Sequence, residues 1–273
     1  MDGTVNRRMV LGSLAAWGIG AAAAARAQQG STMDRIRAQG VVRIGWAIYY
    51  PNVFRDPATN ELAGVMIDYV ALLGRALGVQ VEWIEDNTAT LIAGLQANKF
   101  DLTSPLGITP PRAAAATFPH PLLREGLALL AVRSRIGERS GWDSYDKPGT
   151  KISVTLGSNS DLHVTRLFTQ AEIVRVRSES ESLAQVLTGR VDAKAIGRSA
   201  LQFLLKQRSE IAEVPGSQFQ ATPMSPALRK GDTEFAAWLD DFAAGARRDG
   251  SLLAIMAKYG LDDSFIWPTA LPA

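Results

Sequence analysis

The first part of the chain alternates between strand-like and helix-like hydrophobic patterns. Residues 41–46 and 79–85 have the β-rich, alternating character of strands, whereas residues 64–78 and 88–101 place apolar side chains at helical spacing. A further strand is predicted over residues 101–108. Strand, helix, strand, helix and strand in succession predict a parallel or mixed sheet with covering helices, which is an α/β fold.

The same pattern starts again after a Gly/Pro/Asp-rich loop at residues 140–150, which follows a long apolar strand at residues 126–135. Three strands then alternate with three helices up to residue 210, and residues 222–260 add a strand and two helices. Two such units predict a two-lobed α/β protein with a small-molecule cleft between the lobes. We assign residues 33–132 plus 223–266 to lobe 1 and residues 133–222 to lobe 2, with hinges near 131–134 and 220–225.

The N-terminus has the three parts of an export signal. Arg7 and Arg8 precede a weakly apolar Ala/Gly run, which ends in the small-residue pattern Ala-Arg-Ala at residues 25–27. We therefore expect residues 1–27 to be a signal peptide, twin-arginine-like or Sec, and the mature protein to act in the periplasm. The alternative is an amphipathic or anchoring N-terminal helix.

Charge and composition narrow the classes of function. The chain of 273 residues has a formal net charge of +2, and Arg7, Arg8 and Arg26 against Asp2 account for all of it. The rest is close to neutral, without the basic stripe that nucleic-acid binding requires. The lack of cysteine excludes disulfides, thiolate metal sites and a cysteine nucleophile. Both histidines lack metal-ligand and catalytic-triad spacing, so no metal or cofactor is expected.

One predicted helix start, the segment from Thr109 to Arg112, breaks a local rule. Thr109 suits the N-cap position, and Pro110 suits the first helical position, where no N–H is needed. Arg112 then puts a positive charge into the first turn, against the helix dipole. Its side chain leans back toward the helix N-terminus, where free N–H groups attract anions. The segment therefore predicts an anion receptor, and the alternative is an exposed arginine.

A second predicted helix start has the spacing of a capping box. Ser158 and Asp161 fit the S-x-x-D pattern, and Gly157 precedes them as the turn residue. Such a start needs no ligand, because caps stabilise helices on their own.

Several motifs occur together in an order typical of one family. They are RIG, GVMIDYVALLGRALGVQVEWI, LIAGLQANKFDL, ITPPRAAAATFPHPLLREGLALLAVR, SLAQVLTGRVDA and LRKGD with DGSLLAIMAKYG, from Val41 to about Gly260. The chain resembles the solute-binding proteins of bacterial ABC importers, specifically the amino-acid-binding group called family 3, which have the type-II periplasmic binding fold. The resemblance implies a monomer that is not an enzyme and that carries a small solute to an ABC permease in the inner membrane.

The resemblance also implies a set of ligand-binding residues. It assigns to Arg112 the carboxylate of the ligand, which suits the planar fork of a guanidinium. The other implied ligand-binding residues are Trp46, Tyr50, Thr88, Ser104, Gly107, Thr155, Ser158, Asn159 and Gly197. For the two aromatic residues, a place in the core or at the rim is the alternative.

Departures from the family pattern concern the opposite end of the ligand. Members that bind α-amino acids usually hold the ammonium with an aspartate five residues after Asp192, where this chain has Gly197. Ala47, Pro105 and Gly107 also replace residues that are usual at their positions. The resemblance therefore predicts a site that keeps its anion-binding end and lacks the usual cation-binding residue.

Lys194 and Arg198 add positive charge near that position. We expect both to be solvent-exposed, at a sheet edge and at a helix start, because such side chains are mostly exposed. If either faces the cleft, the ligand is an organic acid or another anion rather than a zwitterion.

Two other functions stay open at this point. The chain also resembles exported cyclohexadienyl dehydratases on the same scaffold, although the predicted cleft contains no evident acid or base for their chemistry. A ligand-sensing domain is the other alternative. The sequence favours a binding protein for a small carboxylate-bearing solute, either an amino acid or a related organic acid.

Overall fold

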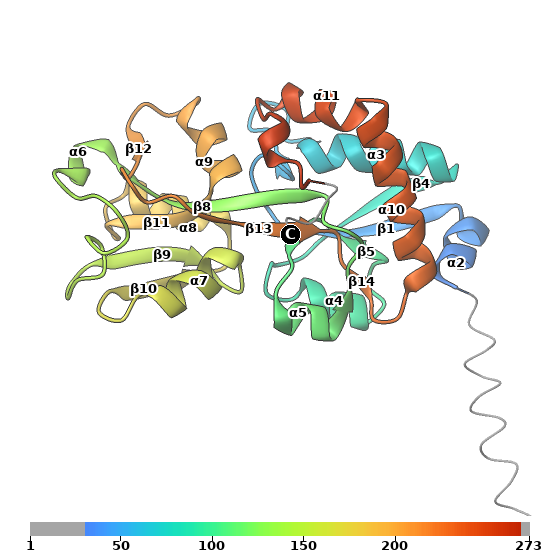
Figure 1. Ribbon diagram of the computed structural model, residues 1–273, viewed down its shortest axis with the longest axis horizontal. Coiled ribbons are helices and arrows are strands. Elements are labelled where there is room, and N and C mark those ends of the chain that lie inside the picture. Colours follow the sequence, from blue (N-terminus) through green and yellow to red (C-terminus); the bar gives the residue numbers. More distant parts are fainter. Residues whose placement is uncertain (1–30, 269–273) are drawn as a thin grey trace, which may run out of the picture.

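Two α/β lobes, side by side along the long axis of the molecule, make up the computed structural model (Figure 1). It describes residues 31–268, without the side chains of residues 219 and 220. The predicted signal peptide, residues 1–27, lies outside the described residues. From residue 31 to residue 268, no helix is both long and apolar enough for a bilayer span.

Lobe 1 is built on a five-stranded sheet in the order β4-β1-β5-β14-β7. Its strands are β1 (Val41–Trp46), β4 (Gln80–Glu85), β5 (Leu102–Thr103), β7 (Ala116–Thr117) and β14 (Leu228–Arg229). β1 pairs in parallel with β4 and β5, and β14 pairs antiparallel with β5. The predicted mixed sheet with covering helices is therefore present.

Helices pack on both faces of this sheet (Figure 1). They are α2 (Thr32–Gln39), α3 (Val65–Leu77), α4 (Leu91–Gln96), α5 (Pro110–Ala115), α10 (Thr233–Arg248) and α11 (Ser251–Lys258). The large core joins β1 to α3, α10 and α11, while a smaller core packs α4 around Phe100. A short hairpin of β2 (Phe54–Arg55) and β3 (Leu62–Ala63) and the 3-10 helix η1 (Asp263–Phe265) complete the lobe.

The second sheet has seven strands in the order β10-β9-β11-β8-β13-β6, with β12 paired to β8. It forms lobe 2, except that its edge strand β6 lies in lobe 1, where Leu106 packs in the core around Phe100. Its strands are β6 (Leu106–Gly107), β8 (Leu123–Val132), β9 (Lys151–Thr155), β10 (Glu172–Val176), β11 (Ala193–Gly197), β12 (Ile211–Glu213) and β13 (Phe219–Ser225). The helices of lobe 2 are α6 (Arg133–Ile136), α7 (Asn159–Leu167), α8 (Glu179–Leu187) and α9 (Arg198–Leu205).

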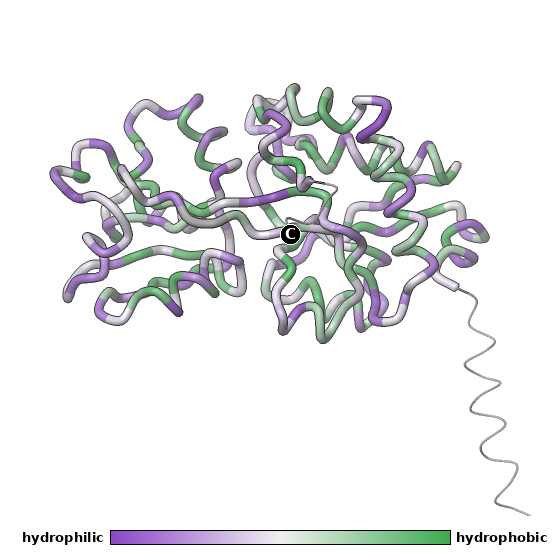
Figure 2. Tube along the Cα trace, viewed as in Figure 1, coloured by the Kyte–Doolittle hydropathy of each residue, from purple (hydrophilic) through white to green (hydrophobic). Residues whose placement is uncertain are grey.

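The lobes are joined by β8 and β13, which run antiparallel to each other across the middle of the molecule (Figure 1). Strands inside the lobes are mostly apolar, whereas the crossing segments also carry polar residues (Figure 2). Leu123 on β8 belongs to the core of lobe 1, and Leu129 belongs to a core of lobe 2.

The position of the first crossing differs from the predicted hinge. Residues 127–130 of β8 already pair with β11, and residues 130–132 pair with β12, so both segments belong to the sheet of lobe 2. The strand therefore changes lobe between residues 123 and 127, before the predicted boundary after residue 132. The apolar run of residues 126–132 lies in lobe 2, and the crossing falls just before it, at Arg124 and Glu125. The prediction placed the boundary at the end of the apolar run instead of at its start. The return crossing in β13 overlaps the predicted hinge at 220–225.

The strand predicted over residues 101–108 is split. β5 joins the sheet of lobe 1, whereas β6 pairs with β13 at the edge of the other sheet. Ser104 and Pro105 separate them and stand beside the cleft. This break brings the segment that leads to Arg112 to the boundary between the lobes.

Candidate functional site

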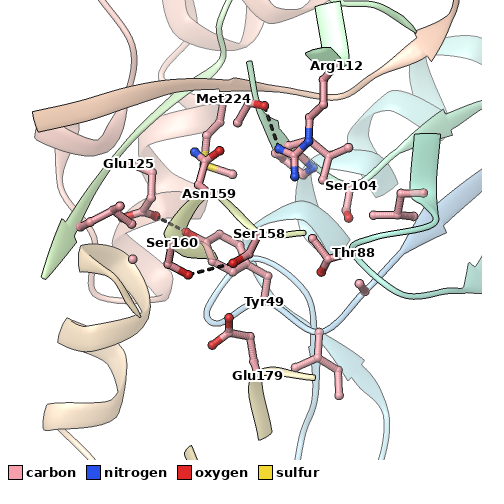
Figure 3. A pocket seen from close by; sticks show the side chains of 18 residues that line it. Tyr49, Thr88, Ser104, Arg112, Glu125, Ser158, Asn159, Ser160, Glu179 and Met224 are labelled. Carbon is pink, nitrogen blue, oxygen red and sulfur yellow. Dashed lines mark hydrogen bonds between the residues drawn. The ribbon is translucent and has the colours of Figure 1, made fainter. Parts of the chain in front are cut away.

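A pocket with an empty volume of about 570 Å³, its mouth included, lies between the lobes. Lobe 1 and the crossing strands provide Ala47, Ile48, Tyr49, Thr88, Leu91, Ser104, Pro105, Leu106, Gly107, Arg112, Glu125 and Met224. Lobe 2 provides Leu127, Ser158, Asn159, Ser160, Glu179 and Gly197. Figure 3 shows the side chains that line it.

Arg112 is the cation of this pocket. Its partly buried guanidinium donates to the carbonyl oxygen of Gly107 at 2.8 Å and to that of Gly157 at 2.7 Å. These carbonyls belong to different lobes, so the side chain bridges the cleft. Burial lowers the pKa of Arg112 to about 10, which leaves it charged at neutral pH. No carboxylate within residues 31–268 forms an ion pair with Arg112, and two carbonyls do not use all five guanidinium N–H groups.

The helix start around Arg112 differs in detail from the prediction. Thr109 is the N-cap residue of α5, but its hydroxyl makes no capping hydrogen bond. Pro110 and Pro111 occupy the first two helical positions and lack N–H groups, so a cap has little to satisfy. For the same reason the helix end offers few donors to an anion. An anion at this wall would therefore be held by the guanidinium itself.

The start of α7 in lobe 2 faces Arg112 across the pocket. Ser158 is its N-cap, and the Ser158 hydroxyl accepts from the backbone N–H of Asp161 at 3.2 Å. The Asp161 carboxylate accepts from the N–H of Gly157 at 2.9 Å rather than from the N-cap residue. The predicted N-cap at Ser158 is confirmed, and Asp161 is its acidic residue as predicted. The N–H that donates to Asp161 belongs to Gly157 and not to Ser158. Together these bonds fix the turn that presents the Gly157 carbonyl to Arg112.

Close approach of the lobes depends on two glycines. A side chain at Gly107 would overlap the Asn159 amide of lobe 2. A Cβ at Gly157 would lie 3.0 Å from the Cα of Ala89 in lobe 1. The turn at Gly157 also has a φ of 71°, which favours glycine. The lobes can therefore meet closely at both points around the pocket.

The structure brings seven of the ten predicted site residues to the pocket. They are Thr88, Ser104, Gly107, Arg112, Ser158, Asn159 and Gly197. Their contact with a ligand stays a prediction. The remaining three do not line the pocket.

Two of those three are aromatic residues that pack elsewhere. Trp46 is 1% exposed in the core of lobe 1, and Tyr50 stacks on Phe203 with ring centroids 5.6 Å apart. Tyr49, the neighbour of Tyr50, lines the pocket instead. The backbone turns sharply here, because Tyr49 pairs with Val53 in an isolated bridge. Counting residues from the strand could not fix which tyrosine points inward.

Thr155, the third residue, lies behind the pocket. Its hydroxyl donates to Oε1 of Glu179 at 2.8 Å, and Glu179 itself lines the pocket. Thr155 is therefore placed to support a pocket residue.

Glu125 is a pocket residue that sequence reasoning missed. Its carboxyl oxygens accept from the Ser199 backbone N–H at 3.0 Å, from the Tyr49 hydroxyl at 2.7 Å and from the Ser199 hydroxyl. Burial raises the pKa of Glu125 above its ordinary value, and these hydrogen bonds oppose that shift. Burial and the neighbouring Glu125 carboxylate raise the pKa of Tyr49 as well. Across the described residues, no cation forms an ion pair with Glu125.

Glu125 lies where the expected aspartate is missing. A Cβ built on Gly197 would lie 3.0 Å from the carboxyl carbon of Glu125. A carboxylate therefore stands beside this position, supplied by β8 instead of β11. The signal in the sequence was an acidic residue directly before the apolar run of residues 126–132.

Glu179 is the second carboxylate of the pocket, and it has an internal partner. Lys194 on β11 forms an ion pair with Oε2 of Glu179, and Lys194 is 0% exposed. The expectation that Lys194 is exposed at a sheet edge is wrong, because β11 lies between β9 and β8 inside the sheet. A buried lysine is tolerated when a carboxylate compensates it. Arg198 begins α9 and does not line the pocket.

The arrangement defines the chemistry that the pocket can perform. It presents a guanidinium and a carboxyl group that have hydrogen bonds but no ion pair within residues 31–268, and a carboxylate neutralised from inside the protein. Small polar and apolar side chains surround them. In Figure 3, Arg112 and the two glutamates lie on different sides of the pocket. Such a site can bind a carboxylate at one wall and a hydrogen-bond donor or cation at another.

Comparison with known families identifies the class of protein. The model of the bacterial extracellular solute-binding proteins, family 3, matches residues 42–262. The chain therefore belongs to this family, and its fold is the two-lobed type-II periplasmic binding fold that the sequence predicted.

Individual relatives are distant but cover most of the chain. The L-cystine-binding protein TcyJ of Escherichia coli is 23% identical over 228 residues, which are 83% of this chain and 85% of TcyJ. Cyclohexadienyl dehydratase of Pseudomonas aeruginosa is 23% identical over 265 residues, which are 96% of this chain and 97% of that enzyme.

Solved structures give the same picture. The ancestral amino acid-binding protein AncCDT-1, described as a precursor of cyclohexadienyl dehydratase, is 27% identical with a TM-score of 0.79, covering 84% of this chain and 99% of its own. A solute receptor for L-cysteine of Neisseria gonorrhoeae is 21% identical with a TM-score of 0.80, covering 87% and 100%.

Proposed function

We propose that this protein is a periplasmic receptor that binds a small carboxylate-bearing solute, an amino acid or a related organic acid, and delivers it to an ABC permease. The observation that carries the proposal is the Arg112 guanidinium, which faces the pocket and, among the described residues, has no carboxylate partner. A cation held away from bulk water is stabilised by an anionic partner, and here that partner comes from solution.

Arg112 also links ligand binding to the approach of the lobes. It donates to a carbonyl of each lobe, and carbonyls alone leave its positive charge uncompensated. A ligand carboxylate on the guanidinium would contact both lobes at once. A ligand that makes contacts available only when the lobes are together shifts the population toward that arrangement.

The carboxyl group of Glu125 favours an amino acid within this proposal. Lys194 does not supply the free cation that would favour a plain organic acid, because its charge compensates Glu179. Glu125 is the pocket carboxyl that residues 31–268 leave without an ion pair. The buried Oδ1 of Asn159 has no hydrogen-bond partner in the same part of the chain. A ligand ammonium would give Glu125 a counter-charge and Asn159 Oδ1 a donor while the ligand carboxylate binds Arg112.

A thermal-shift screen of the mature protein tests the proposal. Amino acids are compared with the same molecules lacking the amino group and with dicarboxylates, aromatic acids and polyamines. Saturating ligand at about 100 times its Kd stabilises the folded state by about 2.7 kcal/mol, a readily measured shift. The expected result is a shift with an amino acid that Arg112→Gln abolishes and Arg208→Gln, a surface control, retains. No shift with any carboxylate would contradict the proposal.

Delivery to a permease needs a test in cells. Loss of the gene is expected to abolish high-affinity uptake of the ligand found in the screen, and the Arg112→Gln allele is expected not to restore it. Normal uptake without the protein would favour the sensing function instead. Gel filtration of the mature protein with and without ligand tests the expected monomer.

A second function, catalysis of the dehydratase type, is favoured by one observation. Glu125 is a buried pocket carboxyl whose raised pKa suits a general acid. The dehydratase relative spans nearly the whole chain. Turnover of prephenate or arogenate that disappears in Glu125→Gln would establish this function. Binding without turnover is the result that the receptor proposal expects.

A further inference from the structure

Glu179 lines the pocket on the side away from Arg112 (Figure 3). It is the first residue of α8, 7% exposed, and both of its oxygens are already bound from inside the protein. Oε1 accepts from the Thr155 hydroxyl at 2.8 Å, and Oε2 is paired with Lys194. The Glu179 carboxylate therefore faces the pocket, but its charge is already compensated by Lys194.

Lys194 forms an ion pair with the Glu179 carboxylate on the side away from the pocket. It is fully buried on the central strand β11, and it does not line the pocket. Burial of an ammonium is costly unless a carboxylate compensates it, and Glu179 is the carboxylate in its ion pair. Lys194 therefore takes the place of the counter-ion that a cationic ligand group would otherwise provide to Glu179.

The charges of the other pocket residues determine which ligand charges the pocket can balance. Arg112 requires one negative charge from the ligand, and Glu125 provides one acceptor for a positive charge. An amino acid with a neutral side chain matches these two groups. A basic amino acid brings a second positive charge, and with Glu179 occupied the lining residues offer it no free carboxylate.

We propose that Lys194 is a specificity-determining residue: as the internal counter-ion of Glu179, it excludes ligands with a cationic side chain from the pocket. The inference rests on the proposed function, because it concerns the distal group of a ligand whose carboxylate binds Arg112. It predicts a ligand with a neutral side chain.

Arginine and citrulline test the inference, because they have nearly the same shape and differ in side-chain charge. Wild-type protein is expected to bind citrulline at least about tenfold more tightly than arginine. Lys194→Met removes the internal ammonium and leaves Glu179 facing the pocket alone. In this variant we expect the preference to reverse by about tenfold or more toward arginine. If wild type does not bind citrulline, norleucine and lysine are the next matched pair.

Glu179→Gln/Lys194→Met is the matched control, because it removes both charges. It is expected to bind arginine no better than wild type does. If Lys194→Met alone does not fold, arginine during refolding is expected to restore its fold and citrulline is not. Failure of arginine to do so, or a folded Lys194→Met that binds neutral amino acids without gaining arginine, would overturn the inference.

Wild-type protein that prefers arginine would overturn it as well. If the proposed function itself is wrong, a different result is expected. In that case no carboxylate-bearing solute stabilises wild type, and Arg112→Gln changes nothing.

Discussion

Two charged walls of one pocket differ in where their partners come from. On the lobe 1 side, Arg112 meets two backbone carbonyls and, within the described chain, no carboxylate. On the lobe 2 side, Glu179 is neutralised by the fully buried Lys194. Buried charges are costly unless they are compensated. We therefore propose that a ligand compensates Arg112, whereas Glu179 already has its counter-ion. In our proposal, Arg112 is the group that recognises the ligand, and Glu179 with Lys194 is a structural pair that shapes selectivity.

The largest effect is expected from breaking the complete pair. Glu179→Gln leaves the Lys194 ammonium buried without a counter-ion, which costs about 3–5 kcal/mol of stability. Urea unfolding measures the loss, and Glu179→Gln/Lys194→Met is expected to recover most of it. A loss below about 1 kcal/mol, or no recovery in the double variant, would show that the pair does not stabilise the lobe.

A smaller effect is expected from the unpaired carboxyl group. Glu125→Gln keeps the hydrogen-bonding shape but removes the charge, and amino acid affinity is expected to fall by about tenfold. Affinity for the same molecule without its amino group is expected to stay unchanged. Calorimetry with both ligands measures the difference. Equal losses for the two would assign Glu125 a structural role only.

The meeting of the lobes can be weakened without touching a charge. Gly107→Ala adds a methyl group that overlaps the Asn159 amide. We expect binding to weaken only a few-fold, because the overlap is with the end of a side chain and not with the backbone. Gly245→Ala is the control, since no atom lies within 4 Å of its added Cβ. That helical substitution is expected to leave binding unchanged and to add about 0.5–1 kcal/mol of stability. Equal binding by both variants would argue against a close approach at Gly107.

The smallest effect is a pH dependence of stability from Glu125. Its pKa is raised in the folded protein, so the folded state binds the proton more tightly than the unfolded state. Stability from this group therefore falls as pH rises from the ordinary glutamate pKa through the raised one. The groups that face it are Tyr49, Ser199 and the start of α9 at Arg198.

Unfolding free energies of wild type and Glu125→Gln between about pH 4 and 8 measure this dependence. The free energy of unfolding of wild type minus that of Glu125→Gln is expected to fall as pH rises. If this wild-type-minus-variant free energy rises with pH instead, the folded state favours the ionised carboxylate of Glu125.

The sequence was sufficient for the parts of the site that depend on local rules. Arg112 stood out because a cation in a first helical turn opposes the helix dipole, and Ser158 because its spacing fits a cap. The alternating periods likewise predicted most of the longer strands and helices of both lobes, but not α2, the β2–β3 hairpin or the break between β5 and β6. Each of these inferences concerns residues within a few positions of one another.

The remaining features depend on packing between distant segments. Glu125 meets Ser199 and Tyr49, each more than 70 residues away, and nothing in a local pattern pairs them. Lys194 meets Glu179 only because α8 packs against the sheet beside β11. The choice between Tyr49 and Tyr50 likewise depends on a turn that residue counting does not resolve.

The central claim is that Arg112 binds the carboxylate of the ligand. The most direct measurement is calorimetry of the wild type and of Arg112→Gln, each with the amino acid found in the screen and with its uncharged carboxamide. We expect wild type to bind the carboxamide about 30-fold or more weakly than the acid, and Arg112→Gln to bind both about equally weakly. Wild-type protein that binds the acid and the carboxamide with equal affinity would contradict the account.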